Sequence, residues 1–380
     1  MNFTVNRNTI RDAGIVQFGT GRFLLAHVDA LVGESLAAGE SEDRILVVQS
    51  STREEGKRKA RLLAERRRYP IRIRGRRNGE TIDREQVIDT VAGCLIAAEQ
   101  WQALERHFIE HARIVVSNTA DNGYDIGDDS SLADVPQSFP GKLTRLLRAR
   151  FEAGNDGLTL LPCELIEHNG QRLKSLVTGL ARRDGAGKTD NDAFLAWLES
   201  RCVWADTLVD RIVSSPLEPL GAIAEPYALW AITRRPGMAV PCTHPDVEIV
   251  DDLTPQTLCK LHILNLAHTF LVHRWQRAGR PVEFVREAMT RPELIDPLQA
   301  VLESEVLPAL ATRLPGERLQ EYRDVTLERF ANPFLDHRLA DIAQNHDAKL
   351  TRRIQPVVEM ARKLGHDTPA LDEALATKDA

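Results

Sequence analysis

The feature that most constrains the fold of this chain is a series of short apolar runs separated by segments with helical spacing. The apolar runs are residues 15–18, 45–48, 114–116, 158–161 and 208–213. Helix-like segments lie between them, for example Arg22 to about Ala38, residues 141–151 and residues 193–202. Short buried strands that alternate with helices predict a parallel sheet covered on both faces. We therefore expect an α/β fold with a Rossmann-like, doubly wound and mostly parallel sheet.

The pattern changes after about Pro216, where prolines punctuate the chain up to Pro245. From Thr254 onward the segments are helical, with almost no strand signal. We predict a Rossmann dinucleotide-binding domain over residues 1–215, a connector over 216–249 and a mainly α-helical substrate-binding domain over 250–380.

Composition argues against several classes of function. The chain is 43% hydrophobic and 27% charged, as soluble globular proteins are, and its net charge of -6 argues against nucleic-acid or membrane-surface binding. No apolar run reaches the roughly 18–20 residues that span a bilayer, and the first residues lack the apolar core of a signal peptide. Five scattered cysteines without a Cys-x-x-Cys pair indicate reduced thiols. We expect a cytoplasmic monomer or homodimer.

A basic stretch over residues 57–77 is the strongest candidate for a nucleic-acid surface. Only Tyr69 interrupts it with an aromatic ring, whereas binding of single strands needs stacking aromatics. The alternation in Ile71-Arg72-Ile73-Arg74, followed by Asn78-Gly79, predicts a half-exposed β-hairpin instead.

The first apolar run ends in a glycine turn, Gly19-Thr20-Gly21, that opens a helix. Two glycines at this junction permit a tight turn and let the backbone approach a pyrophosphate at the helix N-terminus. Leu24 stands where the usual fingerprint has a third glycine. The turn predicts a dinucleotide cofactor contacted by residues 18–23, that is by Phe18, Gly19, Thr20, Gly21, Arg22 and Phe23.

The end of the second run bears on the choice of cofactor. NAD enzymes often place an acid there for the ribose hydroxyls, but this chain continues Gln49-Ser50-Ser51. Gln49 or Ser50 can bond the ribose, and Arg53, Lys57 or Arg58 can meet a 2′-phosphate. We expect NAD, with NADP left open.

The strongest chemical signal is the segment from Thr254 to Leu271, which reads as a buried helix carrying Lys260, His262, Asn265 and His268. On an α-helix, Asn265 lies about 140° and His268 about 80° from Lys260, so one arc carries an amine, an amide and an imidazole. His262 points off this arc and is predicted to be structural.

These residue types suit the oxidation of an alcohol. Burial lowers the pKa of a lysine, so Lys260 can remove the hydroxyl proton as a neutral base. Asn265 can donate to the developing alkoxide, and His268 can orient the partners. The five cysteines include no Cys-x-x-Cys pair of the kind that holds zinc, and no metal is predicted.

The spacing Lys260-x-x-x-x-Asn265-x-x-His268 resembles the signature of the long-chain mannitol dehydrogenase family, which includes fructuronate and tagaturonate reductases (mannonate and altronate oxidoreductases). Other segments resemble the family in the same order: residues 16–27, 117–124, 138–143, 162–170, 209–212, 224–226 and 329–333. Residues 162–165 and 250–255 look closest to the tagaturonate reductase branch.

The resemblance implies a nicotinamide cofactor, no catalytic metal and Lys260 as the general acid/base. It implies that Asn265 and Asn169 cradle the oxyanion and that Asp210 lies near the substrate or nicotinamide. It further implies that Asn118 and Thr119 contact the cofactor, and that Arg329 and His337 hold a substrate carboxylate or hydroxyls. The expected reaction interconverts a secondary alcohol and a ketone on a sugar acid or polyol.

Three alternatives stay open. One is a sugar-phosphate dehydrogenase of the mannitol-1-phosphate type, which needs basic side chains beside the lysine. Another is a non-catalytic NAD-binding regulator, which has no use for a buried lysine. The third is a metal-dependent dehydrogenase, which chelation would inactivate.

Overall fold

The computed structural model describes residues 10, 12–119 and 123–376, and the chain divides into two compact units. Unit 1 comprises Met1–Arg72, Glu85–Ala224 and Ala228–Leu253. Unit 2 comprises Ile73–Arg84, Glu225–Tyr227 and Thr254–Ala380.

Unit 1 is built on a parallel sheet, as predicted, and this sheet has six strands. Its strands, in spatial order, are β5 (Val91–Ile96), β2 (Ile45–Gln49), β1 (Ile15–Phe18), β6 (Ile114–Ser117), β7 (Thr159–Pro162) and β8 (Val203–Trp204). Each neighbouring pair is parallel, and Phe18 at the end of β1 stands opposite Val48 on one side and Ser117 on the other. The strand order reverses beside β1, so the carboxyl ends of β1, β2 and β6 meet where open α/β sheets bind their ligands.

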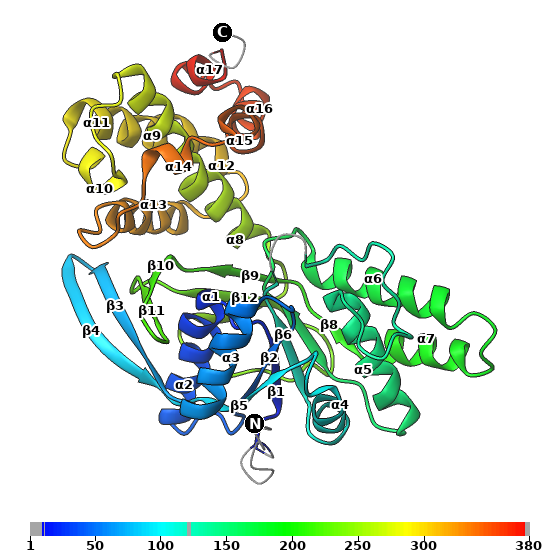
Figure 1. The fold of residues 1–380 in the computed structure, drawn as a ribbon. Coiled ribbons are helices and arrows are strands. Elements are labelled where there is room, and N and C mark those ends of the chain that lie inside the picture. Colours follow the sequence, from blue (N-terminus) through cyan, green and yellow to red (C-terminus); the bar gives the residue numbers. More distant parts are fainter. Residues whose placement is uncertain (1–9, 11, 120–122, 377–380) are drawn as a thin grey trace. The chain divides into compact units, whose positions relative to one another are not determined.

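Helices cover this sheet on both faces. They are α1 (Arg22–Ala26), α2 (Val28–Ala37), α3 (Glu54–Arg66), α4 (Trp101–Glu110), α5 (Phe139–Glu152), α6 (Asn169–Asp184) and α7 (Asn191–Ser200). Figure 1 shows α5, α6 and α7 grouped apart from α1, α2 and α3. One core cluster joins Phe18 and Val48 of the sheet to Phe108 of α4, Leu143 of α5 and Val177 of α6. The predicted helices at residues 22–38, 141–151 and 193–202 are confirmed, the first broken at His27.

The apolar run 208–213 was expected to continue the parallel series, and this is wrong. Its first half forms β9 (Thr207–Asp210), which pairs antiparallel with β12 (Leu229–Thr233) in a sheet ordered β13-β12-β9, where β13 is Val247–Val250. The sixth parallel strand is the two-residue β8 instead. A strand that short leaves no periodic signal.

The region 216–249 is a folded part of unit 1, apart from Glu225–Tyr227, which belong to unit 2, whereas the sequence predicts a connector there. It contains β11 (Ala222–Ala224), β12 and β13, and β11 pairs antiparallel with β10 (Val213–Pro216). Prolines between these short strands hide the pairing in the sequence, because strand pairing depends on residues that are distant along the chain. Unit 1 therefore extends to Leu253.

The predicted hairpin is confirmed. It consists of β3 (Tyr69–Arg77) and β4 (Glu80–Ile88), joined by Asn78 and Gly79 with φ of 55° and 81°. Positive φ at both central residues is the geometry that Asn-Gly favours in tight hairpins. The side chains of β3 alternate between buried and partly buried.

Unit 2 is helical from Thr254 onward, as predicted. Its elements are α8 (Thr254–Cys259), η1 (Lys260–Leu264), α9 (Asn265–Arg277), α10 (Val285–Ala288), α11 (Pro292–Val301), η2 (Leu302–Val306), α12 (Leu307–Leu310), α13 (Gly316–Phe330), α14 (Leu339–Ile342), α15 (His346–Arg353), α16 (Gln355–Lys363) and α17 (Pro369–Ala376). Helix α9 is buried on nearly all sides and forms the centre of the apolar core of this unit. Among the described residues, no helix has the length and hydropathy that crossing a bilayer requires.

Candidate active site

The glycine turn after β1 has the backbone geometry that close approach of a ligand needs. Gly19 has φ of +135°, and a Cβ there would come within 3.0 Å of both the Asn118 carbonyl oxygen and the Leu24 side chain. At Gly21, the N-cap of α1, a Cβ would meet nothing within 4 Å. The turn is therefore tight at its first glycine and open at its second, which fits a pyrophosphate lying against the backbone.

A cleft of about 970 Å³ opens within unit 1 at the carboxyl ends of β1, β2 and β6. Seven of the predicted cofactor residues line it: Gly19, Thr20, Gly21, Gln49, Ser50, Asn118 and Thr119. The volume and the glycine-lined floor suit a dinucleotide.

The other three predicted cofactor residues do not line this cleft. Phe18 is completely buried, with its ring 5.1 Å from that of Phe139 in the core below the cleft. Phe23 stacks on His27 at 4.8 Å, and Arg22 is exposed. Because Phe18 ends a fully buried strand, its side chain packs into the core. Its backbone carbonyl instead accepts from the Asn118 N–H at 3.2 Å.

The end of β2 is locked by the amide of Gln49, which is only 5% exposed. Its Oε1 accepts from the Thr20 hydroxyl at 2.5 Å, and its Nε2 donates to the carbonyl and the hydroxyl of Ser51, both at 2.9 Å. A Cβ on Gly56 would come within 2.5 Å of this Nε2, so the first turn of α3 packs directly on Gln49.

The loop after β6 is tied to the end of β7 through Glu164. One carboxylate oxygen accepts from the N–H and the hydroxyl of Thr119 at 2.9 and 3.0 Å, and the other accepts from Ser117 and Tyr124 at 3.0 and 3.1 Å. Burial raises the pKa of Glu164, against these hydrogen bonds. Glu164 positions the cleft wall, and residue spacing offered no signal for this role.

A second wall of the cleft, residues 125–139, is held by a buried lysine outside the catalytic helix. Asp129 accepts from the N–H groups of Gln137 and Ser138 at 2.9 and 2.8 Å and from the Ser138 hydroxyl at 2.6 Å. Lys142 donates to the Gln137 carbonyl, and burial lowers the pKa of Lys142 to about 8. The sequence analysis assigned a role to neither Asp129 nor Lys142, although Lys142 lies in the segment 138–143 that resembles the family.

The side-chain amide of Asn169 forms hydrogen bonds with the surrounding backbone through both its nitrogen and its oxygen. Its Nδ2 donates to the carbonyls of Pro162, Glu164 and Thr207 at 2.9–3.1 Å, and its Oδ1 accepts from the N–H groups of Gly170 and Thr207. An amide has two donors, and both are already committed. This geometry favours a structural brace between β7, α6 and β9 over the predicted oxyanion role.

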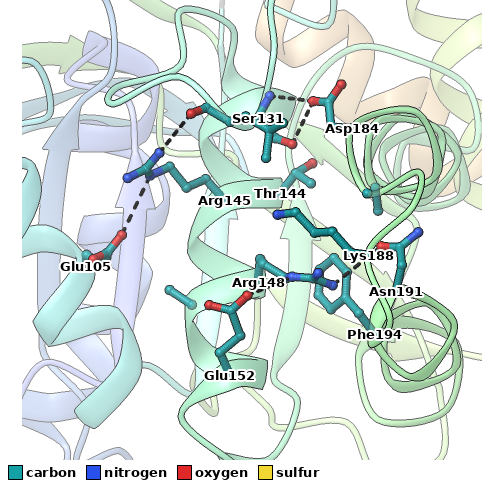
Figure 2. A pocket seen from close by; sticks show the side chains of 14 residues that line it. Glu105, Ser131, Thr144, Arg145, Arg148, Glu152, Asp184, Lys188, Asn191 and Phe194 are labelled. Atoms are coloured by element: carbon teal, nitrogen blue, oxygen red, sulfur yellow. Dashed lines mark hydrogen bonds and ion pairs between the residues drawn. The ribbon is translucent and has the colours of Figure 1, made fainter.

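A smaller cavity of about 290 Å³ lies among α5, α6 and α7 (Figure 2). Its arginines are already paired: Arg148 with Glu152 and Asp190 at 2.9 and 2.8 Å, and Arg145 with Glu105 at 3.8 Å. None of the predicted site residues lines it. The cleft at the sheet edge is therefore the better cofactor site.

The predicted catalytic helix of unit 2 changes its winding at the lysine. Residues Lys260–Leu264 form a π-helical turn between α8 and α9, and the Asn265 N–H donates to the carbonyls of Lys260 and Leu261. A π-turn accommodates one more residue than an α-turn, so it brings residues five apart into register. The α-helical separation of about 140° between Lys260 and Asn265 is therefore wrong, and the two residues lie one turn apart.

The amine and the amide are both partly buried, whereas the histidine of the motif is buried. The His268 ring lies 4.0 Å from the Phe330 ring and 5.0 Å from the His337 ring. Burial, and then the charges of neighbouring groups, hold the pKa of His268 well below its usual range. His268 is thus a neutral imidazole, and the structure places it beside His337.

His262 has the structural role that was predicted. Its Nδ1 lies 2.9 Å from the Arg353 carbonyl, which fastens the π-turn to α15. The Arg353 guanidinium donates to the Asn265 carbonyl at 3.2 Å and to the Thr269 hydroxyl at 2.9 Å. Arg353 supports the bulge from outside the motif, at a distance in sequence that no local pattern reveals.

The guanidinium of Arg329 forms an ion pair with a carboxylate of the protein itself, that of Glu225. Its Nη2 and Nε donate to the two oxygens of Glu225 at 2.7 and 3.0 Å, and both side chains are 3% exposed. Its guanidinium also lies 4.2 Å over the Tyr227 ring. This geometry favours a structural pair over the predicted grip on a substrate carboxylate. Asp210 is buried at the end of β9, opposite Leu229.

Comparisons with known proteins agree with this architecture. The model of the mannitol dehydrogenase Rossmann domain matches residues 13–240, and that of the mannitol dehydrogenase C-terminal domain matches residues 252–378. An altronate oxidoreductase of Bacillus subtilis is 31% identical over 376 residues, which cover 92% of this chain and 76% of that protein. One from Klebsiella pneumoniae is 33% identical, covering 95% and 78%.

Solved structures share the fold. A substrate-free D-sorbitol dehydrogenase has a TM-score of 0.84 at 22% identity, covering 96% of this chain and 79% of that one. The mannitol 2-dehydrogenase of Pseudomonas fluorescens, in a ternary complex with NAD and D-mannitol, has a TM-score of 0.74 at 22% identity and the same coverage. With both of its domains matched in order over most of their length, the chain belongs to the mannitol dehydrogenase family.

Proposed function

We propose that the chain is a nicotinamide-dependent oxidoreductase that interconverts the secondary alcohol of a sugar acid with the corresponding ketone. The observation that carries this proposal is the π-turn that begins at Lys260 and ends where Asn265 starts the next helix. Single π-turns inside helices occur frequently at functional sites. Here an amine and an amide stand one helical turn apart, and these groups can serve as the proton acceptor and the oxyanion donor of an alcohol oxidation.

In the oxidation direction, a nicotinamide cofactor held in the cleft of unit 1 would supply the acceptor for the hydride of the carbinol carbon. The neutral Lys260 amine accepts the hydroxyl proton, and the carbon–oxygen bond becomes a carbonyl. The Asn265 amide donates to the oxygen while it carries negative charge. In the reduction direction the Lys260 ammonium returns the proton, and no metal takes part.

The neutral His268 is proposed to orient the reacting oxygen or the lysine through a hydrogen bond. Because burial keeps the pKa of His268 low, it contributes a dipole rather than a charge. His337 lies at its edge, and we propose that it contacts the substrate hydroxyls. Asp210 is proposed to lie near the reacting groups, and Asn169 is left out of the chemistry because its amide is already committed.

The cofactor is proposed to lie in the cleft of unit 1. The open backbone at Gly21 would meet the pyrophosphate, and Asn118 and Thr119 line the same cleft at the end of β6. Gln49 would shape the adenosine end through its bonds to Thr20 and Ser51.

A hexuronate is the substrate class that the relatives support best. The altronate oxidoreductases align with more than nine tenths of this chain at 31–33% identity, whereas the sorbitol and mannitol dehydrogenases are 22% identical. We therefore propose the altronate–tagaturonate pair ahead of mannitol, sorbitol or mannitol 1-phosphate.

The test is a substrate screen that follows NADH and NADPH absorbance. It covers altronate, mannonate and their keto forms, C4–C6 polyols, and mannitol 1-phosphate, each with and without EDTA. We expect the highest kcat/KM on a hexuronate and unchanged turnover in EDTA. A preference for the sugar phosphate would replace the proposed substrate, and loss of turnover in EDTA would defeat the metal-free mechanism. Tight NADH binding with no turnover on any of them would favour a regulator.

A further inference from the structure

The end of β2, where the cleft would hold the adenosine ribose, lacks the carboxylate that normally binds the ribose hydroxyls. No acid ends β2, and the residue there, Gln49, has both Nε2 hydrogens and one Oε1 acceptor position committed to Thr20 and Ser51. A ribose diol is usually gripped by a carboxylate that accepts from its hydroxyls. Gln49 is held too firmly to substitute for that carboxylate.

Two glutamates begin the next helix, but lysines on the same helix neutralise both. Glu54 pairs with Lys57 at 3.1 Å, and Glu55 pairs with Lys59 at 2.8 Å. Lys59 lowers the pKa of the Glu55 carboxyl, first by its hydrogen bond and then by its charge. Of these four residues, Glu55 and Lys59 line the cleft, so this edge presents a paired carboxylate rather than a free one.

Arg53 is the unmatched charge beside them. It precedes α3, is exposed and lines the cleft together with Ser50 and Ser51. Within the part of the chain that the structure describes, it forms no ion pair and no side-chain hydrogen bond. The close packing of Gly56 on Gln49 fixes the first turn of α3, and with it Arg53, at this edge of the cleft.

From these contacts we infer that Arg53 is a specificity-determining residue that lets this cleft accept NADP(H), by pairing with the 2′-phosphate of the adenosine ribose. This inference rests on the proposed function, because it assumes a nicotinamide dinucleotide in the cleft. A guanidinium matches phosphate oxygens with two parallel hydrogen bonds, and the hydroxyls of Ser50 and Ser51 supply further donors.

The experiment measures the Kd of NADPH and of NADH for the full chain by titration calorimetry. The variants are Arg53→Ala and, as a matched control, Arg66→Ala, since Arg66 is an exposed arginine of α3 that does not line the cleft. We expect the unaltered protein to bind NADPH at least as tightly as NADH. Arg53→Ala should weaken NADPH about 10–100-fold, as loss of a charge-assisted pair does, and change NADH less than threefold. Arg66→Ala should change neither Kd more than threefold.

Three results would overturn the inference. If NADH binds and NADPH does not, the 2′-phosphate is rejected and the inference alone fails. If Arg53→Ala weakens the binding of both cofactors equally, or of neither, Arg53 does not bind the 2′-phosphate. If neither cofactor binds the unaltered protein, the proposed function fails together with the inference. Thermal melts of each variant separate a loss of binding from a loss of fold.

Discussion

The backbone N–H of Asn265 donates to the carbonyl of Lys260, five residues back along the same helix. This bond defines a π-turn, and it is made by backbone groups alone. Arg353 of α15 contacts the bulge through its carbonyl, which lies 2.9 Å from His262 Nδ1, and through its guanidinium, which donates to the Asn265 carbonyl. Side-chain substitutions at Lys260 and Asn265 should therefore test chemistry rather than folding.

Replacing the lysine should abolish proton transfer. We expect Lys260→Ala to lower kcat by about 10²–10⁴ while the Kd of NADH stays within threefold, because a general base contributes in this range. Steady-state kinetics and a cofactor titration measure the two quantities. Lys363→Ala, at an exposed lysine of α16, is the control and should leave both unchanged. Near-normal turnover in Lys260→Ala would defeat the assignment.

Replacing the amide should remove one donor to the reacting oxygen. We expect Asn265→Ala to lower kcat by about 10²–10³, with little change in KM, because the donor acts mainly on the charged transition state. The circular dichroism spectrum should be unaltered, since the π-turn bond belongs to the backbone. An increase in KM at constant kcat would show that Asn265 binds substrate in its ground state only.

Asn169 should behave as a brace. Asn169→Ala leaves several buried backbone groups without partners, so we expect the free energy of unfolding to fall by about 3 kcal/mol. Asn155 offers a matched control, because its amide makes a single 3.2 Å bond to the Ile109 carbonyl. Asn155→Ala should cost less than about 1 kcal/mol in the same urea titration. A stable Asn169→Ala protein with kcat reduced a hundredfold would restore the oxyanion role.

We expect the ion pair of Arg329 and Glu225 to stabilise the fold rather than to bind the substrate. Breaking a buried ion pair leaves an uncompensated charge, so Glu225→Gln should lower the free energy of unfolding by about 3–5 kcal/mol. The double variant Arg329→Met with Glu225→Leu should recover much of this loss. If the double variant is stable but its KM for a hexuronate rises more than tenfold, Arg329 binds the substrate carboxylate after all.

Asp29 should make stability depend on pH. It is completely buried, burial raises its pKa from 3.8 to about 7, and it accepts from the Tyr69 hydroxyl at 2.6 Å. Between these two pH values the unfolded chain has released the proton and the folded protein still holds it, so stability falls as pH rises through this window. Each pH unit in the window costs up to about 1.4 kcal/mol.

Asp29→Asn removes this titration while keeping an acceptor for Tyr69. Compared with the unaltered protein, the variant should gain relative stability as pH rises from 4 to 7 and gain no more above pH 8. Urea titrations at four pH values measure the free energy of unfolding of both proteins. The difference between the two values cancels the contribution of the histidines, because these titrate in both proteins. Parallel pH profiles would show that Asp29 is ionised in the folded state.

The sequence by itself determined the features that depend on neighbours along the chain. Alternating apolar runs and helical segments specified the parallel sheet, and Asn78-Gly79 specified the hairpin turn, because φ and side-chain period are local properties. The ordered motifs identified the mannitol dehydrogenase family, and the Gly19–Gly21 turn located the cleft. Seven of ten predicted cofactor residues line that cleft because they directly follow strands whose ends meet.

Only the tertiary structure decided which partner each buried polar group would find. Glu225 and Arg329 are 104 residues apart, and nothing local to either residue indicates that they pair. The same holds for the five backbone partners of Asn169, for the departure of β9 from the parallel sheet, and for the strands of the region 216–249. The π-turn at Lys260 belongs with them, because helical periodicity cannot reveal one extra residue in a turn that is held by contacts from another helix.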